Sequence, residues 1–484
     1  MSDHGHSWAG DEFQNVDLGD KRLNARLIKL CDRFSDTPES PINQACADWV
    51  ETKAAYRFFQ NANVNVDNIL TAHRHKTAER VAKHNTVLAL QDTSYFVYTK
   101  HTKTEGLGKM TMTKGKHISK IYSHGLMMHS CLAVTTKGLP LGLLDQNIYV
   151  RKLRPEHERR GKSGRYIQDA LSVEKKESYR WLEALTAATD AVDGTRVVTV
   201  CDRESDFYDF FKRSDQIKAP VLIRASQNRT VNRNTRYAEK DVDKLWGYMN
   251  KKPIAGSYKI DIPSKRKTKR NKSSEARTAH VTVKFGSFQM NPPRNNPKHK
   301  TEVLTDIEMH AVHVLETDAP KGMKPVEWML LTNISITSFD EACEKIRWYA
   351  LRWRIEMYFK VLKSGFRVEA CRLSTAERLT RYLAVMSVVA WRLFMITLIA
   401  RTDADTPCIN FMTKQEWTVL YLKTNRNKKL PSTPPTIGQA VNWVARLGGY
   451  LSRKSDGPPG TITLWRGWKR LTDLTEGWNL ADQL

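Results

Sequence analysis

Short apolar runs alternate with helical segments between residues 86 and 224, and this alternation constrains the fold more than any other feature of the chain. Each run has the length of a buried strand, and the segments between them carry apolar residues at helical spacing. The expected strands are residues 86–91, 126–134, 139–144, 197–201 and 221–224, and the expected helices are residues 171–188 and 208–213. A Lys137-Gly138 turn joins the second and third strands. This order predicts an α/β sheet with a parallel component.

Two of the expected strands lead directly into an aspartate. Asp92 follows Leu90-Gln91, and Asp202 follows Val200-Cys201. Ligands and catalytic groups in open α/β sheets gather at the carboxyl ends of strands, where two rigidly held carboxylates can share cations. A single aspartate in such a place is more often a turn residue or a helix cap, so these residues alone leave both interpretations open.

A third acid, Glu356, lies in a segment for which we expect one long helix from about residue 338 to about residue 363, with Ser338 as its N-cap. At about 100° per residue, four functional groups fall within an arc of about 60°, beside the apolar stripe of the helix. They belong to Tyr349, Arg352, Glu356 and Lys363. Ordinary pairing of charges on a surface helix is the alternative explanation of this pattern.

The charge of the chain favours a polyanionic partner. Lys and Arg number 78 against 52 Asp and Glu, which gives a net charge of +26. A charge of this size destabilises the compact state by self-repulsion unless a polyanion is near. Nucleic acid is the usual polyanion, with an anionic membrane surface second and a merely basic enzyme as the plain alternative. We expect two basic segments, residues 151–165 and 264–277, to be loops, and we expect the second of them to contact phosphates.

The cysteines and the apolar stretches indicate a cytoplasmic protein without a membrane partner. None of the seven cysteines forms a C-x-x-C pair or belongs to a set with zinc-site spacing. The N-terminus has no basic segment followed by an apolar one, so we expect no secretory signal. The most apolar stretch, residues 382–400, contains Arg392 and fits a buried amphipathic helix better than a membrane span.

The remaining segments suggest a helical unit at each end and a β-rich region before the last acid. Residues 16–80 carry helical patterns, with Arg22 and Arg26 four residues apart on one face. Such a unit suits DNA contact and suits a capping subdomain with solvated arginines equally well. Strand-like runs dominate residues 226–330, a second long helix is expected at about 375–402, and a basic, Pro-rich linker at 425–435 precedes a small helical region.

The spacing Tyr349-x2-Arg352-x3-Glu356-x6-Lys363 resembles the Y-R-E-K signature of the insertion-sequence-four family of bacterial transposases. The similarity extends over nearly the whole chain. The other segments that resemble the family are GDKRLNAR (19–26), AAYRFFQNANV (54–64), QDTSY (91–95), EKKESYRW (174–181), VCDRESD (200–206), EWMLLT (327–332), ARLGGY (445–450) and WRGWKRL (465–471). The chain departs from the family in the two basic segments, which leaves the DNA end sequence that it recognises open.

The resemblance implies an RNase H-like fold and a particular domain order. A helical DNA-binding domain would occupy residues 1–75, and a helical dimerisation domain residues 403–484. The catalytic core would span residues 76–402, with a β-rich insertion at about residues 226–335. Asp92, Asp202 and Glu356 would form a D-D-E triad that holds two Mg²⁺ ions per active site, and Mn²⁺ would substitute for Mg²⁺.

The resemblance also implies an activity and partners. The enzyme would bind inverted-repeat transposon ends in double-stranded DNA, nick one strand, form and open a DNA hairpin, and transfer the 3′-OH ends into target DNA. Cleavage in trans would require a homodimer. Two other classes stay open at this point: an RNase H-like nuclease without strand transfer, and a DNA-binding protein that has no catalytic activity.

Six further residues receive roles from the resemblance. The residues that would bind phosphates near the scissile bond are Tyr349, Arg352 and Lys363. Trp328 would stack on a flipped base, although a core tryptophan in a strand fits its position about equally well. Arg22 and Arg26 would contact the transposon end.

Overall fold

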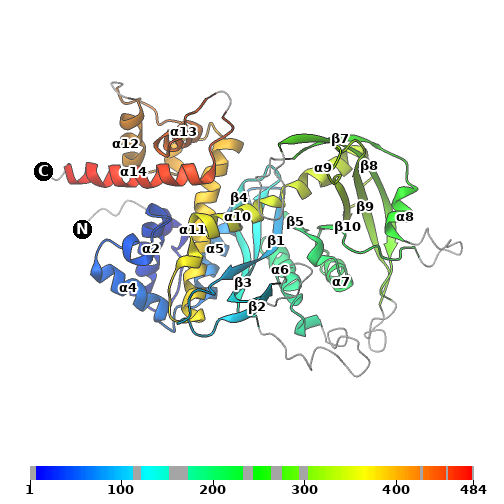
Figure 1. The fold of residues 1–484 in the computed structure, drawn as a ribbon, viewed down its shortest axis with the longest axis horizontal. Coiled ribbons are helices and arrows are strands. Elements are labelled where there is room, and N and C mark those ends of the chain that lie inside the picture. Colours follow the sequence, from blue (N-terminus) through cyan, green and yellow to red (C-terminus); the bar gives the residue numbers. More distant parts are fainter. Residues whose placement is uncertain are drawn as a thin grey trace.

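The computed structural model describes residues 7–112, 121–151, 173–232, 244–262, 275–293, 304–425, 429–453 and 456–481. Within these residues a mixed sheet is flanked by helices, and further helices form both ends of the chain (Figure 1). This arrangement confirms the predicted α/β class. Nearly all of the two basic segments, 151–165 and 264–277, lies outside the described residues, so the phosphate contact expected of the second segment stays a prediction.

One sheet of ten strands runs through the described part of the chain, in the order β2-β3-β1-β5-β6-β10-β9-β8-β7, with β4 paired to β3. Strands β1, β5 and β6 are parallel to one another, and the other pairs are antiparallel. The strands are β1 Thr86–Val97, β2 Gly108–Met112, β3 Ile121–Thr135, β4 Pro140–Tyr149, β5 Arg196–Cys201, β6 Val221–Arg224, β7 Gly256–Ile262, β8 Arg277–Met290, β9 Ile307–Glu316 and β10 Glu327–Thr332. Strands β1, β5 and β6 form the parallel component that the alternation of apolar runs and helical segments predicts.

The β-rich region is part of the core sheet. Strand β10 pairs with β6 through Leu331 and Ile223, and β9, β8 and β7 follow outward from it. A short helix, α8 Leu245–Asn250, precedes the strands of this region. The region expected at residues 226–335 therefore widens the sheet on one side of the parallel strands (Figure 1).

Helices α6 Tyr179–Asp190 and α7 Tyr208–Gln216 lie beside the parallel strands. Helix α6 packs on β1, β3, β4 and β5 through a buried apolar face that includes Trp181 and Leu185. The predicted helix at 171–188 begins late, because a 3₁₀ turn, η3 Val173–Lys175, precedes it. A second such turn, η4 Arg203–Ser205, follows β5.

Five helices form the described N-terminal region: α1 Trp8–Glu12, α2 Lys21–Asp36, α3 Ile42–Ala45, α4 Trp49–Gln60 and α5 Val66–Val81. Side chains of Asp20, Asp48 and Asn65 cap the first turns of α2, α4 and α5. Such capping satisfies amide groups that have no partner within the helix. Helix α5 continues past residue 75 and packs on β4, so the expected boundary at residue 75 falls inside this helix.

Helix α11, Ala376–Thr402, is the central helix of the described structure. Its length and hydropathy would suffice to cross a membrane, but 89% of its most apolar window is buried inside the protein. It contacts α2, α4 and α5 from one end of the chain, β3 and β4 of the sheet, and helices of the other end. Its arginines have partners, since Arg381 donates to the carbonyls of Phe59 and Val64 and Arg392 donates to Phe411. The structure therefore uses it as a core helix.

The single long helix expected from residue 338 to 363 is wrong. Helix α9 Phe339–Ala350 ends, α10 Trp353–Lys360 begins after a tightened turn, and a π-helix, η6 Val361–Gly365, follows. At the tightened turn the amide of Arg352 donates to the carbonyl of Tyr349, three residues back, at 3.0 Å. At the π-helix the amide of Phe366 donates to Val361, five residues back. Uniform helical spacing therefore does not hold across this segment.

The C-terminal helices pack closely on glycines. They are α12 Lys414–Thr424, α13 Ile437–Leu447 and α14 Thr461–Ala481, after the short turns η7 Val368–Ala370 and η8 Cys408–Asn410. A Cβ on Gly467 would lie 1.7 Å from the carbonyl oxygen of Val444, and one on Gly448 would lie 1.8 Å from that of Thr463. Trp465 of α14 likewise covers Gly365 of the π-helix, where a Cβ would lie 2.1 Å from the indole.

We expect Gly467→Ala to lower the free energy of unfolding by about 1–3 kcal/mol, because an added methyl meets a backbone oxygen that no side-chain rotation can move. Gly477→Ala is the matched control, since it lies on the same helix and a Cβ there meets nothing within 4 Å. Alanine favours a helix over glycine, so the control should stabilise by up to about 1 kcal/mol. Chemical unfolding of the full chain measures the free energy of unfolding of both variants. Equal changes in Gly467→Ala and Gly477→Ala would contradict the close approach of α13 and α14 at Gly467.

Candidate active site

The two aspartates lie at the same level of the parallel sheet. Leu90 of β1 pairs with Val200 of β5, and Asp92 and Asp202 each come two residues later. The prediction that a strand ends before Asp92 is wrong, because residues 92–97 continue β1 and pair with residues 125–130 of β3. Asp202 does follow the end of its strand, and its carboxylate accepts from the amide of Glu204 at 2.8 Å.

The third acid meets Asp92 through an arginine. Glu356 lies in the first turn of α10, and Arg352 immediately precedes that helix. One guanidinium nitrogen of Arg352, Nη1, lies 3.3 Å from Oδ2 of Asp92, and the other, Nη2, lies 2.6 Å from Oε1 of Glu356. The guanidinium is buried, and it joins Asp92 to a helix whose N-cap residue lies 260 positions later in the chain.

The electrostatics of Asp92 show that the acids act on one another. Burial raises the pKa of Asp92 to about 7, and although Arg352 lowers it, the charges of Asp202 and Glu356 raise it further. Burial also opposes the charge of Arg352, but Tyr349, Glu356 and Asp92 raise the pKa of its guanidinium. The site therefore combines concentrated negative charge with a permanently protonated arginine.

The side chains of the three acids are of the chemical type that binds divalent metal ions. Carboxylate oxygens are the ligands that Mg²⁺ prefers, and the acids come from three separate elements. In the described residues, no three acidic, His or Cys side chains stand close enough together to hold one ion. The guanidinium of Arg352 contacts both Asp92 and Glu356 and so lies between these two carboxylates. The donor set and its charge fit a metal ion that takes over the role of this guanidinium.

Tyr349 lies near Arg352, and Trp328 packs against Tyr349. The ring centres of Tyr349 and Trp328 are 5.1 Å apart in an edge-to-face arrangement, and Trp328 of β10 is partly buried against the core. Burial raises the pKa of Tyr349, while the charges of Arg352 and Arg224 lower it. Tyr349 therefore lies within electrostatic reach of both arginines.

Arg224 is a site residue that the sequence analysis missed. Cys201 pairs with Ile223 in the parallel ladder, so Arg224 stands at the level of Asp202 on the next strand. Its Nη2 donates to the carbonyl of Glu327 at 2.8 Å, while its Nε is buried with no hydrogen-bond partner in the described structure. A basic residue that ends the third parallel strand was the available signal, because strand ends in such a sheet converge.

Lys363 approaches the same side of β1 from the π-helix. Its ammonium lies 5.2 Å from the ring centre of Phe96, four residues after Asp92. Burial lowers the pKa of Lys363, and the charges of Glu369 and Asp92 raise it. The structure therefore places Lys363 within electrostatic reach of Asp92.

Arg22 and Arg26 do not join the acids, because both lie on α2 in the N-terminal region (Figure 1). The Arg22 side chain is 92% exposed and forms an ion pair with Asp20 at 2.8 Å. Arg26 is half-buried. Helix α4 of the same region has an exposed face, whose large and basic members are Trp49, Val50, Lys53, Tyr56 and Arg57.

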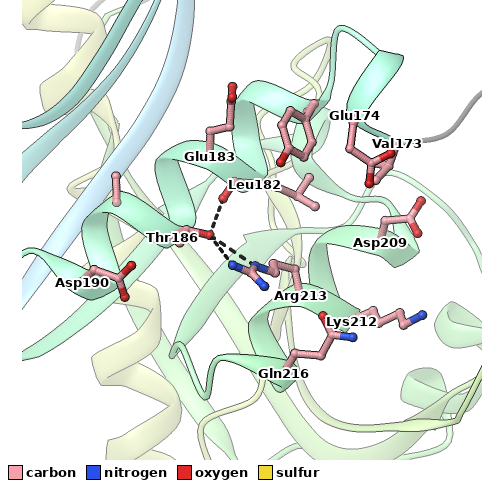
Figure 2. A pocket seen from close by; sticks show the side chains of 12 residues that line it. Val173, Glu174, Leu182, Glu183, Thr186, Asp190, Asp209, Lys212, Arg213 and Gln216 are labelled. Atoms are coloured by element: carbon pink, nitrogen blue, oxygen red, sulfur yellow. Dashed lines mark hydrogen bonds between the residues drawn. The ribbon is translucent and has the colours of Figure 1, made fainter. Parts of the chain in front are cut away.

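A pocket between α6 and α7 has none of these residues. Figure 2 shows this hollow of about 610 Å³, in which the guanidinium of Arg213 donates to the hydroxyl of Thr186 at 3.3 and 3.2 Å. Its acidic lining residues are Glu174, Glu183, Asp190 and Asp209. Because Asp92, Asp202 and Glu356 lie elsewhere, this pocket is separate from the candidate active site.

Comparisons with protein families agree with the order of the regions. A transposase DNA-binding model matches residues 5–64, a transposase DDE domain model residues 171–391, and a transposase Tn5 dimerisation domain model residues 388–483. The DDE match contains Asp202 and Glu356, and Asp92 precedes it.

Together the fold, the site and these matches define a DDE transposase, an enzyme that cleaves DNA. The DDE family works with divalent metal ions. The terminal matches indicate that the protein binds DNA and forms a homodimer. The chain belongs to the Tn5 and insertion-sequence-four family of DDE transposases.

Proposed function

We propose that this enzyme is a cut-and-paste transposase that excises DNA between inverted repeats. It would nick one strand at each end, form and open a hairpin, and transfer the 3′-OH ends into target DNA. The meeting of Asp92 and Glu356 at one guanidinium, with Asp202 level with Asp92, is the observation that supports this most. Each of the four reactions is a displacement at phosphorus, so one site can perform them in turn.

Asp92, Asp202 and Glu356 would hold two Mg²⁺ ions, or Mn²⁺ in their place. Two bound ions supply an activated oxygen nucleophile and a stabilised leaving oxygen. A hydrogen bond from the amide of Thr93, 2.7 Å long, would hold the Asp92 carboxylate in place for metal binding. A hydrogen bond from the amide of Glu204 would do the same for the Asp202 carboxylate.

The cationic residues around the acids would bind the DNA backbone. Arg352 offers a planar fork of donors that suits a phosphate, and Lys363 offers a point charge. A phosphate and an incoming metal ion would together replace the two contacts that Arg352 now makes with Asp92 and Glu356. Tyr349 would bind phosphate beside Arg352, and Trp328 would stack on a base that leaves the double helix at the hairpin.

The N-terminal region would hold the transposon end. The exposed Arg22 would contact phosphate, and Arg26 would reach the same backbone from the next turn of α2. The exposed basic and aromatic side chains of α4 would add to the DNA-binding surface. Helices after about residue 403 would pair two copies, so that one copy cuts the end that the other holds.

The test uses purified protein, Mg²⁺, target plasmid and a linear DNA that carries the inverted repeats flanking the gene. We expect hairpin-ended products on denaturing gels and insertions of the fragment into the plasmid. Scrambled repeats and EDTA serve as the two controls. Nicks without hairpins or insertions would instead indicate a nuclease, and would contradict the proposal.

A further inference from the structure

Arg180 of α6 contacts the strand of Asp92 from the opposite face of the sheet. Asp92 and Thr93 are neighbours on β1, so their side chains point to opposite faces. Arg352 meets Asp92 on one face, and Nε of Arg180 donates to the hydroxyl of Thr93 on the other at 3.1 Å. The amide of Thr93 in turn donates to Oδ1 of Asp92.

The same guanidinium reaches the segment of Asp202. Nη2 of Arg180 lies 3.5 Å from Oε2 of Glu204, and the amide of Glu204 donates to Oδ1 of Asp202 at 2.8 Å. Each aspartate is therefore held by the amide of a residue whose side chain contacts Arg180. One rigid, planar group connects the two strand segments that carry the acids.

The surroundings of Arg180 favour an indirect role. Its side chain is only 10% exposed, and its third donor group, Nη1, is taken by the carbonyl of Glu177. The hydroxyl of Thr93 also lies 2.9 Å from Nδ1 of His129, which packs against Trp181. The Thr93 hydroxyl therefore has both Arg180 and His129 as hydrogen-bond partners. A guanidinium whose three nitrogens each already contact a neighbouring residue is poorly placed to bind a DNA phosphate.

We infer that Arg180 is a positioning residue that fixes the separation of the Asp92 and Asp202 carboxylates and so sets the affinity of the site for divalent metal ions. The inference rests on the proposed function, since it assumes that these acids hold the ions. Residues that hold metal ligands in place without binding the metal themselves change metal affinity by about 10- to 100-fold when they are removed.

The experiment measures Mn²⁺ binding by electron paramagnetic resonance. The sample is the protein bound to a pre-cut duplex of its own inverted repeat, and the Asp202→Asn complex gives the background. We expect Arg180→Lys and Thr93→Val to weaken Mn²⁺ binding at least about tenfold, because an ammonium cannot reach both partners and valine has no hydroxyl. Thr93→Ser should retain near-normal binding.

Arg213→Lys is the matched control. Arg213 of α7 also donates to a threonine hydroxyl, that of Thr186 on α6, and in the described part of the chain its side-chain hydrogen bonds reach neither acid-bearing segment. We expect unchanged Mn²⁺ affinity for this variant. Duplex binding without metal and thermal unfolding of each variant separate an altered site from an altered fold.

Three results would overturn the inference, and a fourth would overturn the proposed function. Unchanged Mn²⁺ affinity with weakened duplex binding in Arg180→Lys would make Arg180 a phosphate contact. Equal losses in Arg180→Lys and Arg213→Lys would indicate general destabilisation. Equal losses of Mn²⁺ affinity in Thr93→Ser and Thr93→Val would show that the hydroxyl of residue 93 does not contribute to metal binding. Identical Mn²⁺ signals from wild type and Asp202→Asn would instead place the metal away from the acids, and the proposed function would fail with it.

Discussion

Asp92→Asn, Asp202→Asn and Glu356→Gln should each abolish DNA cleavage while the protein still binds transposon ends. Each substitution keeps the shape of the side chain and removes the charge that a divalent metal ion needs. The metal contributes several kcal/mol to transition-state stabilisation. At about 1.4 kcal/mol per tenfold change in rate, the expected loss is on the order of 10³-fold or more.

The assay follows cleavage of end-labelled inverted-repeat DNA in Mg²⁺, with end binding measured by gel shift in the absence of metal. Glu183→Gln is the matched control, because it removes the same charge from an exposed acid on α6 that lies in the separate pocket (Figure 2). It should cleave like wild type. Mg²⁺-dependent cleavage that survives in any of the three variants would remove that residue from the triad.

Glu356→Gln also tests the position of Arg352. The guanidinium now divides its contacts between Asp92 and Glu356, and a glutamine would leave it paired with Asp92 alone. End binding should therefore be retained or slightly strengthened, since Arg352 keeps its charge and loses a competing carboxylate. Weakened end binding in this variant would indicate that Glu356 holds Arg352 in a DNA-binding orientation.

Local patterns predicted the elements whose causes are local. The Lys137-Gly138 turn is present, with Gly138 at a φ of +89°, and Thr375 caps the long helix α11. The strands at 197–201 and 221–224 and the helix after Tyr208 fall close to their expected ranges. Turn glycines and cap residues act within a few positions of themselves, so a sequence pattern carries the information.

Errors arose where a distant partner decides the structure. Strand β1 continues past Asp92 because β3 pairs with it there, and the residues near Asp92 in the sequence do not indicate that pairing. The helix breaks near Arg352, whose guanidinium reaches two acids, and widens before Gly365, which Trp465 covers from 100 residues away. Arg224 and Arg180 were missed for the same reason, since only strand register and packing bring them to the acids.

A buried ionic network joins the N-terminal helices to the catalytic sheet. Glu12 of α1 pairs with Arg80 of α5 at 2.8 and 2.9 Å, and with Nδ1 of His73 on the same helix. Nε2 of His73 accepts from the amide of Leu143 on β4 at 2.9 Å. Arg80 also lies 4.3 Å from the ring centre of Trp391 on α11. An acceptor at Nε2 requires neutral His73, with its hydrogen on Nδ1 donated to Glu12.

Both acid–base groups of this network make the fold sensitive to acid. Burial lowers the pKa of His73 below its ordinary value of 6.5, so the fold favours the neutral ring. Burial raises the pKa of Glu12, but His73 and Arg80 outweigh it and lower the value from 4.5 to about 2. Stability from a group with a lowered pKa is complete above its unfolded value and is lost as pH falls. We therefore expect the free energy of unfolding to decrease below about pH 6.5 through His73, and further below about pH 4.5 through Glu12.

Glu12→Ala should have the largest effect on stability, about 3–5 kcal/mol, because it removes a buried carboxylate and leaves both buried His73 and half-buried Arg80 without their acidic partner. Urea unfolding of the full chain at pH 8, 7, 6 and 5 gives both the loss and its pH dependence. His75→Gln is the control, since His75 is exposed on the same helix, and it should leave the pH dependence unchanged. His73→Leu should flatten the decline of the free energy of unfolding between pH 7 and 5. A decline as steep as that of wild type would assign it to other groups.

Because the network joins α1 and α5 to β4 and α11, we expect Glu12→Ala to lose end binding and cleavage together at 37 °C, unlike the triad variants, which lose cleavage alone.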